Sequence, residues 1–185
     1  MRVAVYSGSF DPLHIGHLAI MERLSASREF DWTYLVISPQ NPFKDPVKAL
    51  SAERRYRAAV EAVRRHPDLH VWVDNIELEM PAPHYTIRTL EALREREPGN
   101  EFTLVVGGDN LESIPRWREA PRLLSEFGIV VYPRTGFDTA ALRDRLLSEH
   151  PDYRIRLIDA PLVDISSSEI RDMLARGEDP SKYLM

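Results

Sequence analysis

The sequence contains no cysteine, and only three of its 24 basic residues, Lys44, Lys48 and Lys182, are lysines. Without cysteine, disulfide bonds and thiolate metal sites are excluded. No apolar run approaches the ~20 residues that a membrane-spanning helix needs, and the chain opens on a strand pattern instead of a basic and then apolar leader. These absences predict a cytoplasmic protein. Because lysine is so scarce, a lysine in a loop is a candidate for a functional role.

An excess of positive charge is missing as well. The formal net charge is −5 and the isoelectric point is near 5.7. This balance argues against general binding to nucleic acid or to an anionic membrane. A chain of 185 residues is long enough to bury one core, and no repeat, low-complexity tract or linker divides it. We therefore expect a single domain over residues 1–185, with no nucleic-acid or membrane partner, and the sequence leaves a homo-oligomer open.

Apolar runs alternate with helical patterns along the chain. Strand patterns occur around Val3 and Val5 and over residues 32–38, 69–73, 102–106, 127–132 and 154–158. Helical periodicity covers residues 15–24, 84–96 and 139–150, and another helical face joins Tyr56, Ala59, Val60 and Val63. Strands that alternate with helices imply right-handed crossovers. The sequence thus predicts an α/β fold with a doubly wound parallel sheet.

The first strand pattern runs into a loop that contains Gly8, and two histidines follow where the first helix is expected. Glycine has no Cβ, so Gly8 lets the backbone approach a ligand and tolerates a positive φ. Free N–H groups and the positive end of the helix dipole favour phosphate at such a position. His14 and His17, three residues apart, are expected on one face of the first helical turn. The pattern indicates a site for polyphosphate chemistry.

Four polar or glycine-containing segments each follow a predicted strand. They are the Gly8 loop, the loop with Lys44, Gly107-Gly108-Asp109, and residues 166–171. Ligands of open α/β sheets bind outside the carboxyl ends of the strands. Since all four segments fall on that same edge of the sheet, we expect them to form one site.

The serine-rich segment 166–171 has the spacing of a capping box, with Ser166 at the cap and Glu169 three residues later. The expected buried stripe of the following helix consists of Ile170, Met173 and Leu174. On these residues alone, a capped C-terminal helix accounts for the pattern. Arg171, however, lies in the first turns beside hydroxyls and unpaired N–H groups. We therefore expect a second anion site there, suited to the far end of a triphosphate.

Four segments together resemble a known family. Residues 8–17 read Gly-Ser-Phe-Asp-Pro-Leu-His-Ile-Gly-His, and residues 165–171 read Ile-Ser-Ser-Ser-Glu-Ile-Arg. Both are similar to motifs of the nucleotidyltransferase superfamily with the (H/T)xGH signature. Residues 83–90, and residues 106–110 followed by Pro-Arg-Trp at 115–117, are similar to segments of the bacterial nicotinate-nucleotide adenylyltransferases. The resemblance covers nearly the whole chain and implies a Rossmann-like nucleotidyltransferase fold.

The resemblance implies transfer of an adenylyl group from ATP to nicotinate mononucleotide, giving deamido-NAD and pyrophosphate in NAD biosynthesis. The nucleophile is a phosphate monoester with a second pKa of ~6, so it is largely dianionic at neutral pH and needs no general base. The remaining obstacle is repulsion between anions, so catalysis consists of in-line positioning and electrostatic stabilisation. Mg²⁺, held mainly by phosphate oxygens and water, would accompany the ATP, and no side-chain metal site is expected.

The resemblance also assigns roles to single residues on the ATP side. His14 and His17 would contact the phosphates, and Lys44 would bridge the reacting groups. Arg171 would hold the β/γ end of the triphosphate together with Ser167, so the predicted catalytic residues are the two histidines, the lysine and this arginine. The other predicted ATP contacts are Gly8, Ser9, Phe10, Gly107, Asp109, Ile165 and Ser166.

On the acceptor side, the resemblance implies that Trp117 stacks on the nicotinate ring while Tyr85 and Thr86 supply backbone amides for its carboxylate. Asp109 would bind ribose hydroxyls. The remaining predicted acceptor contacts are Ser9 and Lys44. Without the other motifs, Trp117 would more often be part of a core, and Thr86 would be only the first residue of a helix.

One residue departs from the family pattern. The family commonly has His-Lys at the end of the second loop, whereas this chain has Phe43-Lys44. The lysine is kept but a polar neighbour is lost, which leaves the acceptor-side contacts of this loop open. A nucleotide-binding sensor without activity is the alternative from another class. Such a protein would be expected to lack His17, Lys44 or Arg171, and all three are present.

Two other acceptors remain as alternatives. Phosphopantetheine adenylyltransferases have similar first and serine motifs, but they usually carry threonine where His14 stands. They also have no reason to carry Tyr85 and Thr86 together with Trp117. The second alternative acceptor is nicotinamide mononucleotide, because one or two hydrogen bonds decide between the acid and the amide.

Overall fold

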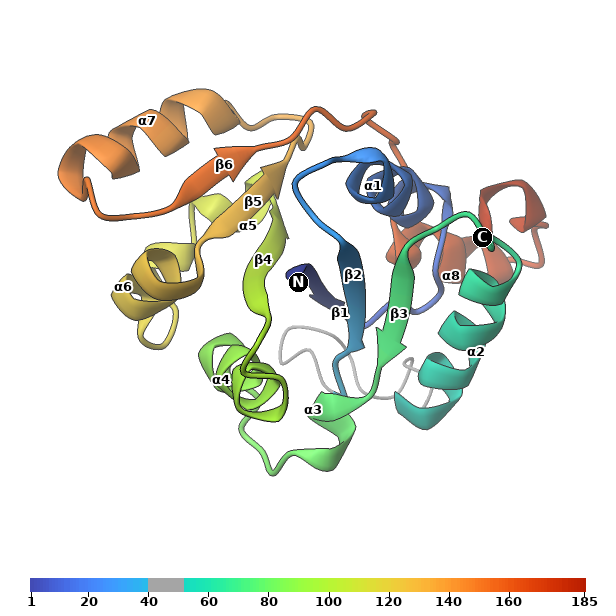
Figure 1. Ribbon diagram of the computed structural model, residues 1–185. Helices are drawn as coiled ribbons and strands as arrows, with labels where there is room; N and C mark the ends of the chain where they lie inside the picture. The colour runs from blue at the N-terminus through green and yellow to red at the C-terminus, as the bar shows by residue number, and fades with distance from the viewer. Residues whose placement is uncertain (40–51) are drawn as a thin grey trace.

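The computed structural model describes residues 1–39 and 52–185, and a six-stranded sheet runs through the middle of this part (Figure 1). The strands are β1 (Arg2–Gly8), β2 (Trp32–Ile37), β3 (Val71–Asp74), β4 (Glu101–Gly107), β5 (Ile129–Tyr132) and β6 (Ile155–Leu157). Their spatial order is β3-β2-β1-β4-β5-β6, and each of the five pairings is parallel. This is the strand order of a doubly wound sheet, so the predicted fold class is confirmed.

Successive side chains of β1 point to opposite faces of the sheet and enter two separate cores. Val3 and Val5 belong to one core, whereas Ala4 and Tyr6 belong to the other. All four side chains are buried. Both faces of the sheet are therefore covered, which is why its strands read as continuous apolar runs in the sequence.

Two groups of helices cover the two faces (Figure 1). α1 (Ile15–Ala26) and α2 (Ala52–Arg64) pack on the side of Tyr6. The opposite face carries α3 (Ile76–Glu79), α4 (Thr86–Arg96), α6 (Ala120–Arg122) with the π-helical turn η2 (Leu123–Phe127), and α7 (Thr139–Glu149). The chain therefore changes face between β3 and β4. No helix in the described ranges is both long and apolar enough to cross a bilayer.

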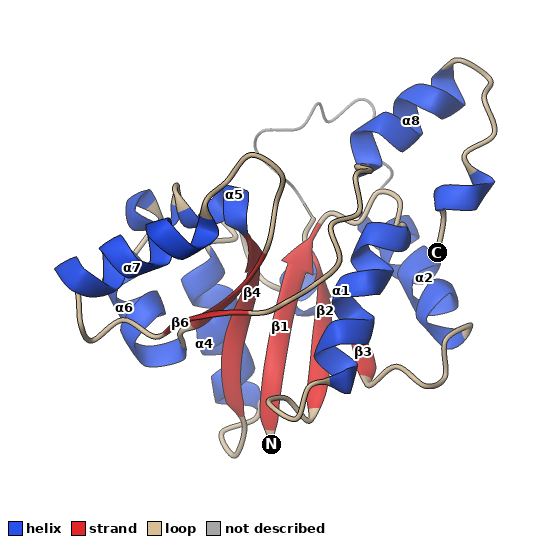
Figure 2. Ribbon diagram, turned by 90° about the horizontal axis from the view of Figure 1, so that it is seen from above, coloured by secondary structure: helices blue, strands red, loops and turns tan. Residues whose placement is uncertain are grey.

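The remaining helices are α5 (Gly108–Leu111), the 3₁₀ turn η1 (Ile114–Arg116), α8 (Ser167–Ala175) and the 3₁₀ turn η3 (Ser181–Tyr183). Of these, α5 and α8 lie toward the end of the sheet to which the strand arrowheads point (Figure 2). The predicted strands and long helices are confirmed with shifts of a few residues at their ends. The short helices α3, α5 and α6 are not predicted by the sequence pattern, because three or four residues are too few to show a helical period.

One predicted apolar face is partly wrong. Leu174 is 54% exposed, although Ile170 on the same helix is fully buried. The reason is the place of α8, which extends away from the sheet so that only its first turns meet other elements (Figure 2). On α2 the predicted face is confirmed, because Ala59 is buried and Tyr56, Val60 and Val63 pack partly buried against the same core. Arg55 on this helix is only 3% exposed, which the sequence pattern did not predict.

Arg55 is a buried ion that joins two loops at the carboxyl end of the sheet. Its Nη1 donates to the carbonyl oxygens of Ser9 (2.6 Å) and Ser38 (2.8 Å), and its Nη2 donates to Pro39 O (3.1 Å). Burial lowers the pKa of the Arg55 guanidinium, and the charge of Asp11 opposes this shift. A planar guanidinium presents several donors at fixed angles, which an ammonium does not. Arg55 thereby holds the loop after β1 against the loop after β2.

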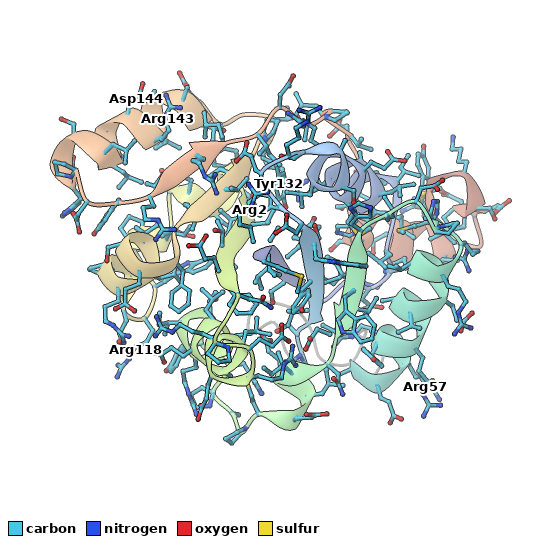
Figure 3. All side chains as sticks on the ribbon, viewed as in Figure 1. Arg2, Arg57, Arg118, Tyr132, Arg143 and Asp144 are labelled. Carbon is cyan, nitrogen blue, oxygen red and sulfur yellow. The ribbon has the colours of Figure 1, made fainter. Side chains whose placement is uncertain are left out.

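Replacement of Arg55 by methionine should lower the free energy of unfolding by about 3 kcal/mol, because three part-buried carbonyl oxygens lose their donor. Urea unfolding followed by circular dichroism measures the change. Arg57→Met is the matched control, since Arg57 lies on the same helix at the outside of the molecule (Figure 3) and pairs there with Glu53. Equal unfolding free energies for the two variants would contradict the role given to Arg55.

Candidate active site

Two neighbouring cavities lie at the carboxyl ends of β1, β4 and β5. The larger one, of about 270 Å³, is lined by His14, His17 and residues of the segments that follow β5 and β6. The smaller one, of about 120 Å³, is lined by Thr86 and by the ends of β1 and β4. Tyr6 and Tyr132 line both cavities. The strand order reverses between β1 and β4, and ligands of such sheets bind at this point.

His14 and His17 face the larger cavity as a stacked pair, with ring centroids 3.7 Å apart. His14 is the N-cap of α1, not a member of its first turn, and its Nδ1 accepts the Gly16 N–H at 3.1 Å. The Nδ1 of His17 accepts the His14 N–H at 3.2 Å. Since each Nδ1 accepts, a neutral ring carries its proton on Nε2. Both rings therefore present an Nε2–H donor, as the recognition of an anion requires.

Gly8, Phe10 and Gly16 determine the space around the two histidine rings. A Cβ on Gly16 would lie 3.0 Å from the His14 ring, so glycine there leaves room for the cap. The Phe10 ring packs edge-on against His17 at a centroid distance of 5.0 Å. In contrast to the prediction, the positive φ of the loop is at Phe10 (44°) and not at Gly8. Gly8 instead makes room for Phe10, because a Cβ on it would lie 3.1 Å from that ring.

The capping box of α8 is confirmed at the edge of the larger cavity. The Ser166 hydroxyl accepts the Glu169 N–H at 3.2 Å, and Glu169 Oε2 accepts the Ser166 N–H at 2.8 Å. The Ser166 hydroxyl and then its backbone N–H hold the pKa of Glu169 below its usual value. Ile165, Ser166 and Glu169 all line the larger cavity.

Ser167 and Arg171 contact the loop after β1 instead of the cavity. The Ser167 hydroxyl donates to Pro12 O at 3.0 Å, and Arg171 Nη1 donates to Asp11 O at 2.5 Å. Arg171 Nη2 donates to the Ser168 hydroxyl at 3.0 Å. These contacts join residues 166–171 to the loop after β1, although Arg171 and Asp11 are 160 positions apart in the sequence. Neither residue is among those that line the larger cavity, which differs from their predicted direct contact with ATP.

Asp109 lies on α5 and lines the larger cavity beside an arginine that the sequence analysis missed. Arg134 follows β5 by two residues, and its Nε lies 3.6 Å from Asp109 Oδ1. Among the described residues, this Nε is the buried side-chain nitrogen without a hydrogen-bond partner. An orphaned buried donor at a cavity wall is a ready partner for a ligand oxygen. The strand-end rule that singled out Asp109 would have found Arg134 if it had been applied to β5.

Tyr6 and Tyr132 form the wall between the cavities, with their rings edge-to-face at 6.0 Å. Burial raises the pKa of the Tyr6 hydroxyl well above its ordinary value, and the Tyr132 hydroxyl beside it acts in the same direction. Tyr6 therefore stays neutral at physiological pH. It adds no charge to the wall between the cavities.

The smaller cavity brings together two predicted acceptor residues and one predicted ATP residue. Thr86, Trp117 and Gly107 all line it, although they come from α4, the end of η1 and the end of β4. A Cβ on Gly107 would lie 2.3 Å from Asp109 Oδ1 and 3.1 Å from the Tyr132 ring, so glycine here leaves room for the Asp109 carboxylate. Trp117 is held by its Nε1, which donates to the Ser113 hydroxyl at 3.2 Å.

The N-terminus of α4 carries unused donors. Tyr85 is its N-cap but makes no side-chain cap, and its own N–H donates to Pro83 O at 3.1 Å. The Tyr85 amide is therefore occupied, in contrast to its predicted role. In the described part of the chain, no acceptor is recorded for the Thr86 and Ile87 N–H groups at the start of this helix. An uncapped helix N-terminus favours an anion.

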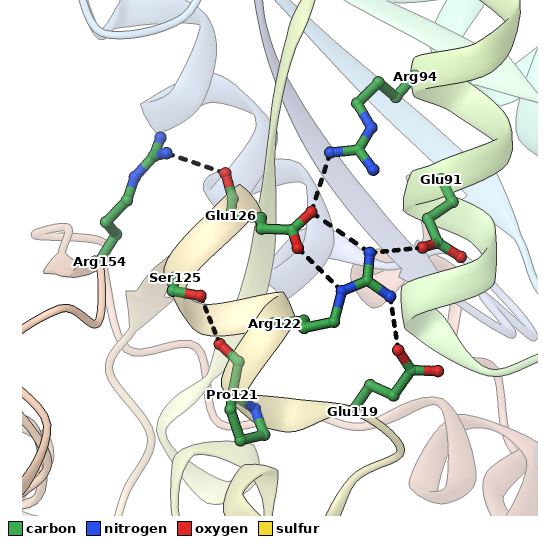
Figure 4. Close-up of polar contacts among 8 residues, drawn as sticks. All are labelled: Glu91, Arg94, Glu119, Pro121, Arg122, Ser125, Glu126 and Arg154. Carbon is green, nitrogen blue, oxygen red and sulfur yellow. Dashed lines mark hydrogen bonds and ion pairs between the residues drawn. The ribbon is translucent and has the colours of Figure 1, made fainter.

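An exposed ion network holds the segment after Trp117 on α4 (Figure 4). Arg122 donates to Glu91 on α4, to Glu119 and to Glu126, at 2.6 to 2.9 Å. Arg94 on α4 also pairs with Glu126 at 3.1 Å. Single surface pairs contribute little, but several charges that share one guanidinium restrain a geometry more strongly. The network fixes the segment that carries Trp117.

Two further predictions concern Lys44 and the metal ion. Lys44 lies outside the described residues. Within the described ranges, no group of three His, Cys, Asp or Glu side chains is close enough to hold a metal ion. Near the cavities, Asp109 lies beside Arg134 and Glu169 accepts from Ser166. Because both carboxylates already have partners, these residues fit a Mg²⁺ that is bound to the triphosphate and coordinated mainly by phosphate oxygens and water.

The chain is similar to known proteins over nearly its full length. The cytidylyltransferase-like family model matches residues 5–173. A probable nicotinate-nucleotide adenylyltransferase from Bacteroides fragilis is 37% identical, with 99% of this chain and 87% of that protein covered. One from Porphyromonas gingivalis is 36% identical, covering 100% of this chain and 89% of that protein.

The fold also matches a solved structure. A Plasmodium falciparum nicotinic acid mononucleotide adenylyltransferase complexed with NaAD superimposes with a TM-score of 0.80, at 21% identity, over 99% of this chain and 90% of that chain. That likeness concerns the fold, whereas the two bacterial relatives establish the kinship of the sequence. On these grounds, the chain belongs to the nicotinate-nucleotide adenylyltransferase family of nucleotidyltransferases.

Proposed function

We propose that the protein transfers AMP from ATP to nicotinate mononucleotide and releases pyrophosphate. The observation that carries this proposal is the pair of adjoining cavities, each with its own donors for an anion. ATP occupies the larger cavity, beside the stacked histidines, and the acceptor nucleotide occupies the smaller one, beside the open end of α4. The names of the bacterial relatives and the NaAD complex of the Plasmodium falciparum enzyme support this assignment.

The reaction requires one in-line displacement. A phosphate oxygen of the acceptor attacks the α-phosphorus of ATP, and the bond to the bridging oxygen of the β-phosphate breaks, so pyrophosphate leaves with that electron pair. The attacking phosphate is already largely ionised at neutral pH, so no side chain has to remove a proton. The protein's contribution is orientation and stabilisation of negative charge.

His14 and His17 supply that stabilisation through their Nε2–H groups. Both rings are fixed by their Nδ1 contacts and by stacking on each other, and Phe10 packs against His17, so little reorganisation is needed when charge develops. Arg134 adds a cation on the opposite wall, next to Asp109, which we assign to the ribose hydroxyls. For Arg171 we propose contact with the β/γ end through Nη2, whose bond to the Ser168 hydroxyl a phosphate oxygen can replace.

Mg²⁺ bound to the triphosphate supplies further neutralisation of the leaving pyrophosphate. We propose that Lys44 bridges the reacting groups from the second loop. Gly8, Ser9 and Phe10 contribute to the ATP site mainly through the backbone of the first loop. For Ser9, this backbone is anchored by Arg55.

The smaller cavity favours the acid over the amide. Its described lining contains no charged side chain, so an acceptor carboxylate is best recognised by the unused Thr86 and Ile87 N–H groups at the positive end of α4. A carboxamide would place its own N–H donors against these donors. Trp117 provides the face on which the pyridine ring stacks.

We further propose that residues 1–185 act as a single domain, because one sheet supports both cavities. A cytoplasmic location and a homo-oligomer stay predictions from the sequence.

A pyrophosphate-release assay with ATP, Mg²⁺ and one acceptor at a time tests the proposed function. Nicotinate mononucleotide should give the highest kcat/KM, followed by its amide, and phosphopantetheine should give none above background. The assay without acceptor provides the control for ATP hydrolysis. Better turnover with the amide or with phosphopantetheine would overturn the assignment, and release that needs no acceptor would point to a hydrolase.

His17→Ala should lower kcat by about 100-fold, because one preorganised donor to the reacting phosphate is lost. The KM for ATP should change by less than about threefold, since the donor acts mainly in the transition state. Steady-state kinetics with both substrates varied measure the two effects. An unchanged kcat would remove His17 from the transition state. The control His66→Ala, two residues beyond the end of α2, should leave both constants unchanged.

Trp117→Ala should raise the KM for nicotinate mononucleotide by about tenfold, because the ring loses its stacking partner. The KM for ATP should stay the same. Trp72→Ala serves as the control, since Trp72 is 59% exposed on the edge strand β3. If both variants behave alike, or if the Trp117 variant weakens ATP instead, then Trp117 belongs only to the core.

A further inference from the structure

Glu77 is a buried carboxyl that the proposed reaction does not use. It lies on the one-turn helix α3 and is 4% exposed. Its Oε1 accepts the Thr89 hydroxyl at 2.8 Å and the Ser7 hydroxyl at 3.4 Å. No Lys, Arg or His among the described residues lies within ion-pair distance of it. The buried Asp74 nearby is different, because it forms two hydrogen bonds with the Arg96 guanidinium, at 2.6 and 3.2 Å.

Hydrogen bonds, and not an ion pair, hold the Glu77 carboxyl in this position. Burial of a carboxylate is unfavourable unless charge or strong hydrogen bonds compensate it. Glu77 has two hydroxyl donors and the nearby N-terminal turns of α4, whose dipole offers partial positive charge. Loss of the carboxyl would leave the buried Thr89 hydroxyl without this acceptor, which is destabilising. The question is therefore what the two hydroxyl contacts accomplish.

The two hydroxyls connect Glu77 to both sides of the smaller cavity. Ser7 comes from the end of β1 and lines that cavity directly. Thr89 lies three residues after Thr86, on the same side of α4, and Thr86 also lines the cavity. One carboxyl oxygen thus sets the separation between the strand end and the helix N-terminus that face each other across the cavity.

We propose that Glu77 is a positioning residue for the acceptor nucleotide. By holding Thr89 and Ser7, it keeps the Thr86 and Ile87 N–H groups at the distance from β1 that the acceptor requires. The larger cavity is not lined by Ser7, Thr86 or Thr89, so ATP binding does not depend on this contact. The inference rests on the proposed acceptor being bound in the smaller cavity.

Glu77→Met removes the acceptor oxygen at similar volume, and it should raise the KM for nicotinate mononucleotide by about tenfold through loss of positioning. The KM for ATP should change less than about twofold, and the thermal midpoint should fall, because the Thr89 hydroxyl loses its acceptor. Glu77→Gln keeps a carbonyl oxygen for both hydroxyls, so it should restore most of the acceptor affinity. Glu79→Met is the matched control, because Glu79 lies exposed on the same turn of helix.

The outcomes separate the inference from the proposed function. A wild-type protein without turnover of nicotinate mononucleotide would refute the function, whatever the variants do. Given wild-type turnover, equal loss for both substrates, or a lowered thermal midpoint with unchanged KM values, would show that Glu77 is only structural. If Glu77→Met fails to fold, Thr89→Val and Ser7→Ala probe the same contact singly. Unchanged acceptor KM in both would also overturn the proposal, and a selective rise would support it.

Discussion

The parallel pairing of β1 with β4 is the contact on which both cavities depend. β1 is followed by a crossover to β2 on one side, while β4 leads to β5 on the other. The segments after these two strands therefore diverge and leave a crevice between them. Tyr6 from β1 and Tyr132 from β5 divide this crevice into a larger and a smaller part. Two nucleotides can then meet at one edge of a sheet without a second domain.

Buried polar groups keep the walls of the crevice in place. Arg55 binds the loop after β1 to the loop after β2, and Arg171 binds the first motif to α8. On the acceptor side, Glu77 joins β1 to α4. Each contact uses a group that is costly to bury unpaired, so the walls have few alternative arrangements. Such restraint suits a reaction that depends on positioning and electrostatics more than on acid–base chemistry.

Contacts within a few residues were well predicted. The stacked His14 and His17, the capping box of Ser166 and Glu169, and the inward face of α4 all follow from spacing alone. The place of Trp117 in the acceptor cavity agrees with the family resemblance, but its role stays a prediction. The wrong expectation for Leu174 has the same physical origin as the successes, since a helical period shows an apolar face without showing whether anything covers it.

The sequence by itself determined the alternation of strands and helices, the doubly wound sheet and the two motifs at its carboxyl edge. Only the tertiary structure decided that Arg55 and Glu77 are buried, that the Nε of Arg134 has no hydrogen-bond partner at the cavity wall, and that Arg171 turns to Asp11, 160 residues away. The reason is physical. Periodicity and capping report hydrogen bonds and packing within one or two turns, whereas the partner of a buried charge depends on the order in which distant strands assemble.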